Sequence, residues 1–160
     1  SDFKFTTAVQ AWGYLAHQLG YSDGKFLLEK WKVSREFSTA VSKFLTAYDK
    51  RLKGDFSPED LYNLGKSSLT LVEEMFAAQN LEMNFEQISA LDAQLQIRTK
   101  KEIAVSAGQI MTEFGIQPGP QIGQLFHQIE LEIVKGHLQN TPQHIFDYVK
   151  KTLGELKFHK

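Results

Sequence analysis

The sequence predicts an all-α fold, an irregular array of several helices in two small helical subdomains. Three observations support this prediction. Apolar residues recur at spacings of three and four along most of the 160 residues. Serine, threonine or asparagine often precedes such a run, where a helix start needs a capping side chain. Residues 91–101 lack the helical spacing, and we place a boundary there, which gives subdomains 1–92 and 93–160.

Capping residues mark the first helices of the first subdomain. One helix is expected over residues 8–19, with Gly20 ending it. Ser22 is the expected N-cap of a short second helix, and Ser34 is the expected N-cap of a longer third one. Trp31 falls at helical spacing in the second helix. Because such aromatic residues usually pack inward, we expect it in the core rather than as a stacking platform for bases.

Further helix starts follow in the same subdomain. Ser57-Pro58-Glu59-Asp60 combines a cap, a first-turn proline and acidic residues near the positive end of a helix. The next helix, around residues 69–76, carries apolar side chains three and four apart. Asn84-Phe85-Glu86-Gln87 has the form of a capping box, in which the first and last side chains each accept from the other's backbone N–H.

The second subdomain begins with a change of pattern. Apolar and polar residues alternate within residues 91–101, so we expect a short extended linker there. A short helix is expected over residues 103–113. The clearest helix of the chain is Pro120 to Lys135, whose apolar residues form one stripe. Asn140-Thr141-Pro142 supplies a cap and a first-turn proline for the last helix.

The composition limits the possible functions. The chain carries 18 basic and 19 acidic side chains, and its net charge of −1 argues against a generic nucleic-acid binder. Residues 25–53, however, hold eight basic side chains against three acidic ones, and a local basic surface of this kind can meet phosphates. The sequence has no cysteine and no long apolar run, so we expect a cytoplasmic location and no membrane partner.

No catalytic or metal-binding residue is predicted in this chain. Two-metal nucleotidyl transfer needs carboxylates aimed at one point, usually as Asp-x-Asp, and the sequence has no such motif. Glu130 and Glu132 lie about 200° apart around a helix, so they cannot share a metal. The five histidines form no His-x-x-x-His pair, and no glycine-rich phosphate loop occurs. We therefore expect no cofactor in this chain.

The turn before the clearest helix is a candidate anion site. Gly115 suits the left-handed position after a helix, and Pro118 and Pro120 end one helix and pre-set the next. Gly119 leaves the backbone N–H groups of the helix start open, and these groups attract anions together with the helix dipole. A tight connection that binds no ligand accounts for the same residues. If an anion binds, we expect a nucleic-acid phosphate.

Three blocks of sequence together resemble the C-terminal part of bacterial CCA-adding enzymes, the class II tRNA nucleotidyltransferases. The blocks, in chain order, are Ala11-Trp12 with Leu28–Ser34, then Leu95–Val105, then Gly115–Gly123 with Ile129-Glu130 and Gly136–Asn140. They stand in the family's order and cover most of the chain. Three positions depart from the family pattern: Gln96 replaces a proline, Ala107 a glycine and Gln121 an aromatic residue.

The resemblance implies a fragment that holds tRNA. The family's N-terminal catalytic head and its neck have no counterpart here, so Mg²⁺, CTP and ATP are expected only in that absent part. The body and tail of the family hold the acceptor and T arms of tRNA, and this chain would pack against its own missing head and neck. We expect no DNA partner. Two alternatives stay open: the C-terminal part of a related poly(A) polymerase, and a helical protein-interaction module without an RNA role.

A holder of all tRNAs needs phosphate contacts rather than base-reading contacts. Scattered basic side chains and open helix starts supply such contacts. The RNA-binding residues that we predict are Lys30, Lys32, Arg35, Arg98, Lys100, Lys101 and Gly119.

Overall fold

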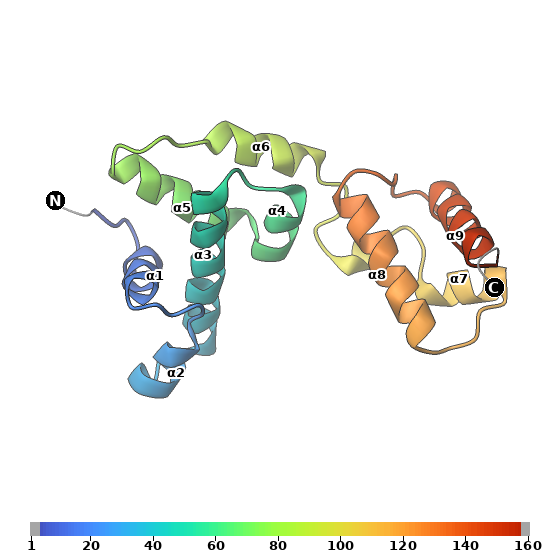
Figure 1. Cartoon of the computed structure of the whole chain (residues 1–160), viewed down its shortest axis with the longest axis horizontal. Helices are drawn as coiled ribbons and strands as arrows, with labels where there is room; N and C mark the ends of the chain where they lie inside the picture. The colour runs from blue at the N-terminus through green and yellow to red at the C-terminus, as the bar shows by residue number, and fades with distance from the viewer. Residues whose placement is uncertain (1–3, 158–160) are drawn as a thin grey trace. The chain divides into compact units, whose positions relative to one another are not determined.

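A computed structural model describes residues 4–157, with side chains to residue 154, and confirms the all-α fold. Within these residues the chain forms α-helices and one 3₁₀ turn, and no strand. Contacts divide the chain into two compact units, unit 1 (Ser1–Ala93) and unit 2 (Gln94–Lys160) (Figure 1). Each unit has its own buried core.

Unit 1 is built around its longest helix, α3. Its helices are α1 (Ala8–Gln18), α2 (Lys25–Trp31), α3 (Arg35–Lys53), α4 (Pro58–Leu64), α5 (Lys66–Ala78) and α6 (Phe85–Gln94). Helices α1 and α5 make the largest contacts with α3, and α2 and α4 also touch it (Figure 1). The residues of α3 that recur at helical spacing, Val41, Phe44, Leu45 and Tyr48, are buried in this core.

The buried face of α1 is made of small and polar residues. A Cβ atom at Gly13 would overlap the ring of Phe44, so only glycine allows α1 to approach α3 this closely. Gln10 is fully buried on the same face, and its Nε2 donates to the carbonyl of Leu71 in α5 over 2.8 Å. Ala16 is also fully buried. This face therefore docks α1 onto α3 and α5 by close approach.

A buried ion pair joins three helices of unit 1. The Glu73 side chain of α5 is fully buried, and its Oε1 accepts from the Nε of Arg51 over 2.6 Å. Its Oε2 accepts from the backbone N–H of Asn84, also over 2.6 Å. The guanidinium of Arg51 donates to the Glu82 carbonyl over 3.0 Å and lies 4.8 Å from the ring centroid of Phe76. One carboxylate thus fixes the end of α3, the middle of α5 and the start of α6.

Unit 2 contains the 3₁₀ turn η1 (Lys100–Glu102) and the helices α7 (Ala107–Phe114), α8 (Pro120–Val134) and α9 (Pro142–Lys157). Branched aliphatic side chains fill its core. The fully buried ones are Ile97, Ile110, Ile129, Ile133, Ile145 and Val149. The stripe predicted for the clearest helix is confirmed, because it supplies Ile129 and Ile133 to this core.

Two amide side chains hold the irregular segments of unit 2. The Nε2 of Gln96 donates to the carbonyls of Leu138 (2.9 Å) and Ile133 (3.3 Å), and its Oε1 accepts from the N–H of Asn140 (2.9 Å). The side chain of Asn140 in turn accepts from the Ala104 N–H and donates to the Glu102 carbonyl, both over 2.8 Å. Gln96, which departs from the family pattern, therefore satisfies backbone groups where α8 ends.

Several predicted helix ends are confirmed. The Ser34 hydroxyl accepts from the Phe37 N–H over 3.1 Å. Ser57 and Asp60 form a complete capping box at α4, with proline at the first turn. Gly115 ends α7 in the left-handed conformation, with φ of 64°. These signals are local, so the sequence alone could specify them.

Other boundaries were predicted wrongly. Ser22 does not cap α2, which begins after Gly24, because the Gly24 N–H is taken by the Ser42 hydroxyl of α3 over 2.7 Å. The expected linker 91–101 is shorter, since α6 continues to Gln94 and η1 begins at Lys100. The helix expected over 103–113 starts instead at Ala107, because Ser106 caps it.

Two side-chain predictions also need correction. The capping box at Asn84 is only half formed: its Oδ1 accepts from the Gln87 N–H over 3.2 Å, but its own N–H goes to Glu73. Trp31 is not in the core, because 61% of it is exposed. Its ring packs at the surface, edge to face against Trp12 at 5.4 Å between ring centroids.

Candidate nucleic-acid interface

The first group of predicted RNA-binding residues lies where α2 ends and α3 begins. Lys30, Lys32 and Arg35 are all exposed. The Lys30 ammonium lies 3.4 Å from the Tyr21 hydroxyl. Lys32 ends α2 in the left-handed conformation, with φ of 53°, which turns the chain between two basic residues. Three cations thus lie around one helix junction, beside the exposed carboxylates of Glu29 and Glu36, which leaves a local excess of one positive charge.

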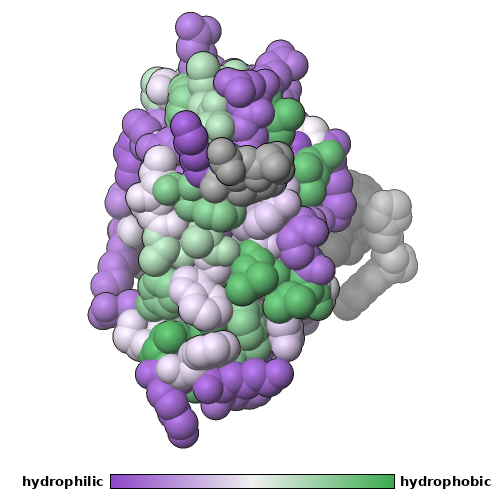
Figure 2. Space-filling view, turned by 90° about the vertical axis from the view of Figure 1, so that its left-hand side faces the viewer, coloured by the Kyte–Doolittle hydropathy of each residue, from purple (hydrophilic) through white to green (hydrophobic). Residues whose placement is uncertain are grey.

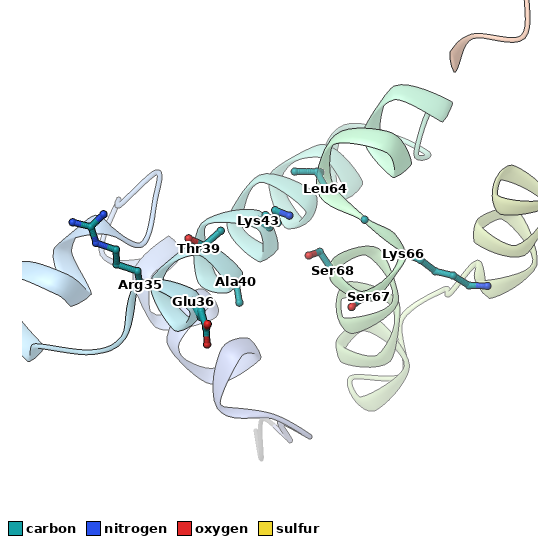
Figure 3. A pocket seen from close by; sticks show the side chains of 10 residues that line it. Arg35, Glu36, Thr39, Ala40, Lys43, Leu64, Lys66, Ser67 and Ser68 are labelled. Atoms are coloured by element: carbon teal, nitrogen blue, oxygen red, sulfur yellow. The ribbon is translucent and has the colours of Figure 1, made fainter. Parts of the chain in front are cut away.

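Arg35 also lines an open hollow of about 570 Å³ between α3 and the start of α5 (Figure 3). Lys43, Lys66 and Ser67 line it as well, and sequence reasoning did not select them. Figure 3 shows Arg35 and Lys66 extending away from the hollow in opposite directions. The Lys66 ammonium pairs with Asp92 over 3.0 Å. The Glu36 carboxylate lines the hollow as well, so its rim carries both signs of charge and its cations do not converge on one point.

The second group lies in the segment before and within η1. Arg98, Lys100 and Lys101 are exposed, and the Arg98 backbone N–H donates to the Glu102 carboxylate over 3.0 Å. The Lys100 ammonium lies 3.7 Å from the Glu130 carboxylate of α8 and 5.1 Å from the ring centroid of Phe126. Lys100 is thus partly neutralised and ties η1 to α8.

Gly119 precedes the first residue of α8, and no side chain caps this helix start. The φ of Gly119 is 167°, which is extended backbone, and a Cβ atom there would meet no atom within 4 Å. The open surroundings leave room for an anion at the first N–H groups of α8, but the turn itself does not demand glycine. Lys100 contacts α8 at Phe126 and Glu130, two to three turns further along the helix.

The structure therefore places the predicted residues in separate patches. Lys30, Lys32 and Arg35 form one patch in unit 1, and Arg98, Lys100 and Lys101 form another in unit 2. Spread contacts of this kind suit a phosphate backbone, which offers many equivalent charges, better than a compact small anion.

The described part of the chain lacks the features of two other kinds of site. Among its residues, no group of three or more histidine or acidic side chains is placed to hold a metal ion. None of the helices within residues 4–157 is both long and apolar enough to cross a membrane.

Comparison with known proteins decides the family. The family model for tRNA nucleotidyltransferase domain 2 matches residues 3–149. This chain belongs to that family. The chain is 40% identical over 152 residues to the CCA-adding enzyme of Streptococcus mutans serotype c. The aligned residues are 95% of this chain and 38% of that enzyme. It is 37% identical over 151 residues to the CCA-adding enzyme of Streptococcus gordonii, again with 38% of the relative covered.

A solved structure has the same fold as this tRNA nucleotidyltransferase domain 2 chain. It is the Bacillus stearothermophilus CCA-adding enzyme in complex with CTP, with a TM-score of 0.83 and 22% identity. The match covers 98% of the chain and 40% of that structure. The chain therefore spans about two-fifths of the length of the relatives that it matches, and the resemblance to CCA-adding enzymes is confirmed.

Proposed function

We propose that this chain is the C-terminal, tRNA-holding region of a CCA-adding tRNA nucleotidyltransferase. The observation that supports it is the similarity of nearly the whole chain to 38% of the length of CCA-adding enzymes. In this proposal the chain holds the acceptor and T arms of tRNA through phosphate contacts. The absent head binds Mg²⁺, CTP and ATP and adds CCA to the 3′ end, and the chain packs against that head and its neck.

We propose that the seven predicted residues make the contacts to tRNA phosphates. Arg98 and Lys101 are exposed in unit 2, and Lys30, Lys32 and Arg35 are exposed in unit 1. Lys100 lies beside the Glu130 carboxylate, which partly neutralises its charge. The open start of α8 at Gly119 adds backbone N–H donors. Such contacts carry no base information, as expected for a protein that must accept every tRNA.

The binding test compares two double variants of the same unit. Arg98→Ala/Lys101→Ala removes two proposed contacts, whereas Lys150→Ala/Lys151→Ala removes two exposed lysines of α9 and is the matched control. Affinity for tRNA transcripts lacking CCA is measured by anisotropy at several salt concentrations. We expect weaker binding to every tRNA in the first variant and a salt slope flattened by up to about two units, because fewer counterions are released.

Equal affinities and equal salt slopes in the two double variants would contradict the proposed contacts in unit 2, provided that both melt at the parent temperature. Binding that does not depend on salt in any variant would favour the protein-interaction module instead. Equally tight binding to single-stranded RNA without tRNA structure would favour the poly(A) polymerase alternative.

We also propose that this chain alone adds no nucleotide. The sequence supports this because it has no Asp-x-Asp motif, and Glu130 and Glu132 diverge around α8. Incubation with tRNA lacking its 3′ end, CTP, ATP and Mg²⁺ should yield no longer product. Extension by a sample free of contaminating transferase would refute the assignment of catalysis to the absent part.

A further inference from the structure

One buried serine of unit 1 has a side chain without a partner in the described part of the chain. Six polar or charged residues are buried there, and five of them form hydrogen bonds or ion pairs: Gln10, Ser38, Asp60, Glu73 and Glu130. The sixth, Ser68 of α5, is 8% exposed, and its hydroxyl forms no hydrogen bond with any described residue. Because burying an unpaired hydroxyl costs free energy, proteins normally pair such a group with protein, water or a ligand.

The backbone around Ser68 also lacks partners, since this residue lies in the first turn of α5. Gly65 precedes the helix and offers no capping side chain. The first three N–H groups, of Lys66, Ser67 and Ser68, donate to no described residue. A Cβ atom at Gly65 would meet no atom within 4 Å, so the space beside this turn is open. Unpaired N–H groups and the helix dipole together favour an anion at such a start.

The hollow beside this helix start brings one ammonium group to the same place. Lys43 of α3, Ser67 and Ser68 all line the hollow. Figure 3 shows the side chains of Lys43 and Ser68 pointing into the space between α3 and the start of α5. Lys43 is exposed and forms no ion pair with a described carboxylate. Amide, hydroxyl and ammonium donors therefore share one end of the hollow.

The rest of the hollow does not offer this combination. Arg35 and Glu36 line it further back on α3, and Glu36 lies seven residues before Lys43, about 10 Å along the helix. The Lys66 ammonium is already paired with Asp92 over 3.0 Å. An anion is thus expected only at the end of the hollow that the start of α5 forms with α3.

We propose that this end of the hollow binds a phosphate group. The α5 site is defined as Lys43, Ser67 and Ser68. Phosphate oxygens accept from the N–H groups of a helix start, from hydroxyl groups and from an ammonium group, and bonds to a charged acceptor are stronger than neutral ones. The phosphate also supplies the acceptor that the Ser68 hydroxyl lacks. Its source is either inorganic phosphate or the backbone of an RNA, since both present the same oxygens.

The α5 site differs from the other surfaces of unit 1. Its three residues are not among the seven predicted RNA-binding residues, so this inference does not rest on the proposed function. Figure 2 shows hydrophobic and intermediate residues gathered between hydrophilic margins on the side where α1 and α2 lie. Apolar side chains offer an anion few donors, so we expect the phosphate at the start of α5 and not on that side.

Titration of the ¹⁵N-labelled 160-residue chain with inorganic phosphate, followed by NMR, tests the site. Sodium chloride keeps the ionic strength constant. We expect saturable shifts of the Ser67 and Ser68 amide signals. The Asp60 amide is the control and should not shift, because the Ser57 hydroxyl already caps the start of α4. A parallel titration with a tRNA transcript identifies the source: RNA shifts the same two amides if its backbone occupies the site, and leaves them unshifted if the site takes inorganic phosphate alone.

The variant Ser68→Ala separates a binding role from a structural one. Since the hydroxyl has no partner in the fold, its loss should leave the melting temperature unchanged and raise the Kd for phosphate about fivefold. Lys43→Met should raise that Kd roughly tenfold, because it removes a charge-assisted hydrogen bond. Lys53→Met is the matched control. It removes an exposed lysine of the same helix, about 15 Å further along, and should leave the Kd unchanged.

Amide signals of Ser67 and Ser68 that move no more with phosphate than with chloride would overturn the inference. So would a Ser68→Ala chain that melts at a lower temperature than the parent and binds phosphate equally well, since the hydroxyl would then serve packing. Failure of the proposed function is a separate result. It appears as equal tRNA affinities of the two double variants in unit 2, and the phosphate titration does not depend on it.

Discussion

Replacing Arg51 by methionine tests the ion pair that joins α3, α5 and α6. The methionine keeps much of the aliphatic contact with Phe76 but removes the Arg51 guanidinium from the fully buried Glu73 carboxylate, to which the Asn84 N–H still donates. Removing one partner of a buried pair costs about 3–5 kcal/mol, because an uncompensated charge stays in the interior. Unit 1 spans residues 1–93, and a domain of that size has a total stability of roughly 5–14 kcal/mol. The loss should therefore be a large fraction of its stability.

Glu73→Gln, which replaces the carboxylate by a neutral amide, is the second single variant of a double-mutant cycle. Glu73→Gln keeps an oxygen that can accept a hydrogen bond, and Arg51 is left 13% exposed, with the Glu82 carbonyl still beside it. We expect this variant to lose about 1–3 kcal/mol, the usual cost of weakening buried hydrogen bonds. The double variant Arg51→Met/Glu73→Gln has no unpaired buried charge. Its loss of unfolding free energy should therefore be smaller than the sum of the losses in the two single variants.

Urea unfolding followed by tryptophan fluorescence measures unit 1 by itself, because the only two tryptophans, Trp12 and Trp31, lie in it. Lys53→Met is the control: its pair with Asp49 joins side chains that are 72% and 52% exposed. Such a surface pair is worth at most about 0.5 kcal/mol. A loss below about 1 kcal/mol for Arg51→Met would refute the reasoning, since it would mean that water reaches the carboxylate.

Two further predictions concern a helix cap in unit 1 and an amide in unit 2. Burial raises the pKa of Asp60, but the N–H and hydroxyl of Ser57 and the Lys50 ammonium outweigh it and lower the pKa. Since the folded pKa lies below the unfolded one, Asp60→Asn should cost about 1 kcal/mol at pH 7. The difference in unfolding free energy between the parent and this variant should vanish as pH falls through the folded pKa. If urea titrations give the same difference at every pH, the ionised Asp60 carboxylate is not its cause. Gln96→Ala should speed amide exchange at Asn140, measured by NMR, because that N–H donates to Gln96 Oε1; unchanged exchange would show that the bond does not protect it.

The helices could be predicted from the sequence where their ends depend on local chemistry. Ser34 and Ser57 cap their helices through side chains three residues from the N–H groups that they accept, so a short window of sequence contains the whole signal. Ser22 offers the same signal, yet α2 begins later, because Ser38 and Ser42 of α3 bind the backbone of Gly24. The start of α2 is therefore set by tertiary contacts, which a local sequence pattern does not contain.

The candidate site was predictable in kind but not in detail. Basic residues at 98–101 and the open turn at Gly119 could be selected from sequence, because charge and proline–glycine chemistry are visible there. The sequence could not separate Lys100 from Lys101. Only the fold brings Glu130 and Phe126 beside Lys100, which makes that lysine partly structural. Long-range pairing, which residue type does not reveal, therefore determines how far the charge of a basic side chain is neutralised.

Trp31 shows how a prediction can be wrong for this chain and still be physically sound. Its helical spacing predicted a buried side chain, but the ring is 61% exposed and packs edge to face against Trp12. Trp31 is the last residue of α2, and Lys32 after it turns the chain out of the helix in the left-handed conformation. Trp12 is itself partly buried and packs against the core cluster of unit 1. Helical spacing therefore predicts the face of a helix on which a side chain lies, but it does not predict how far along the helix the core extends.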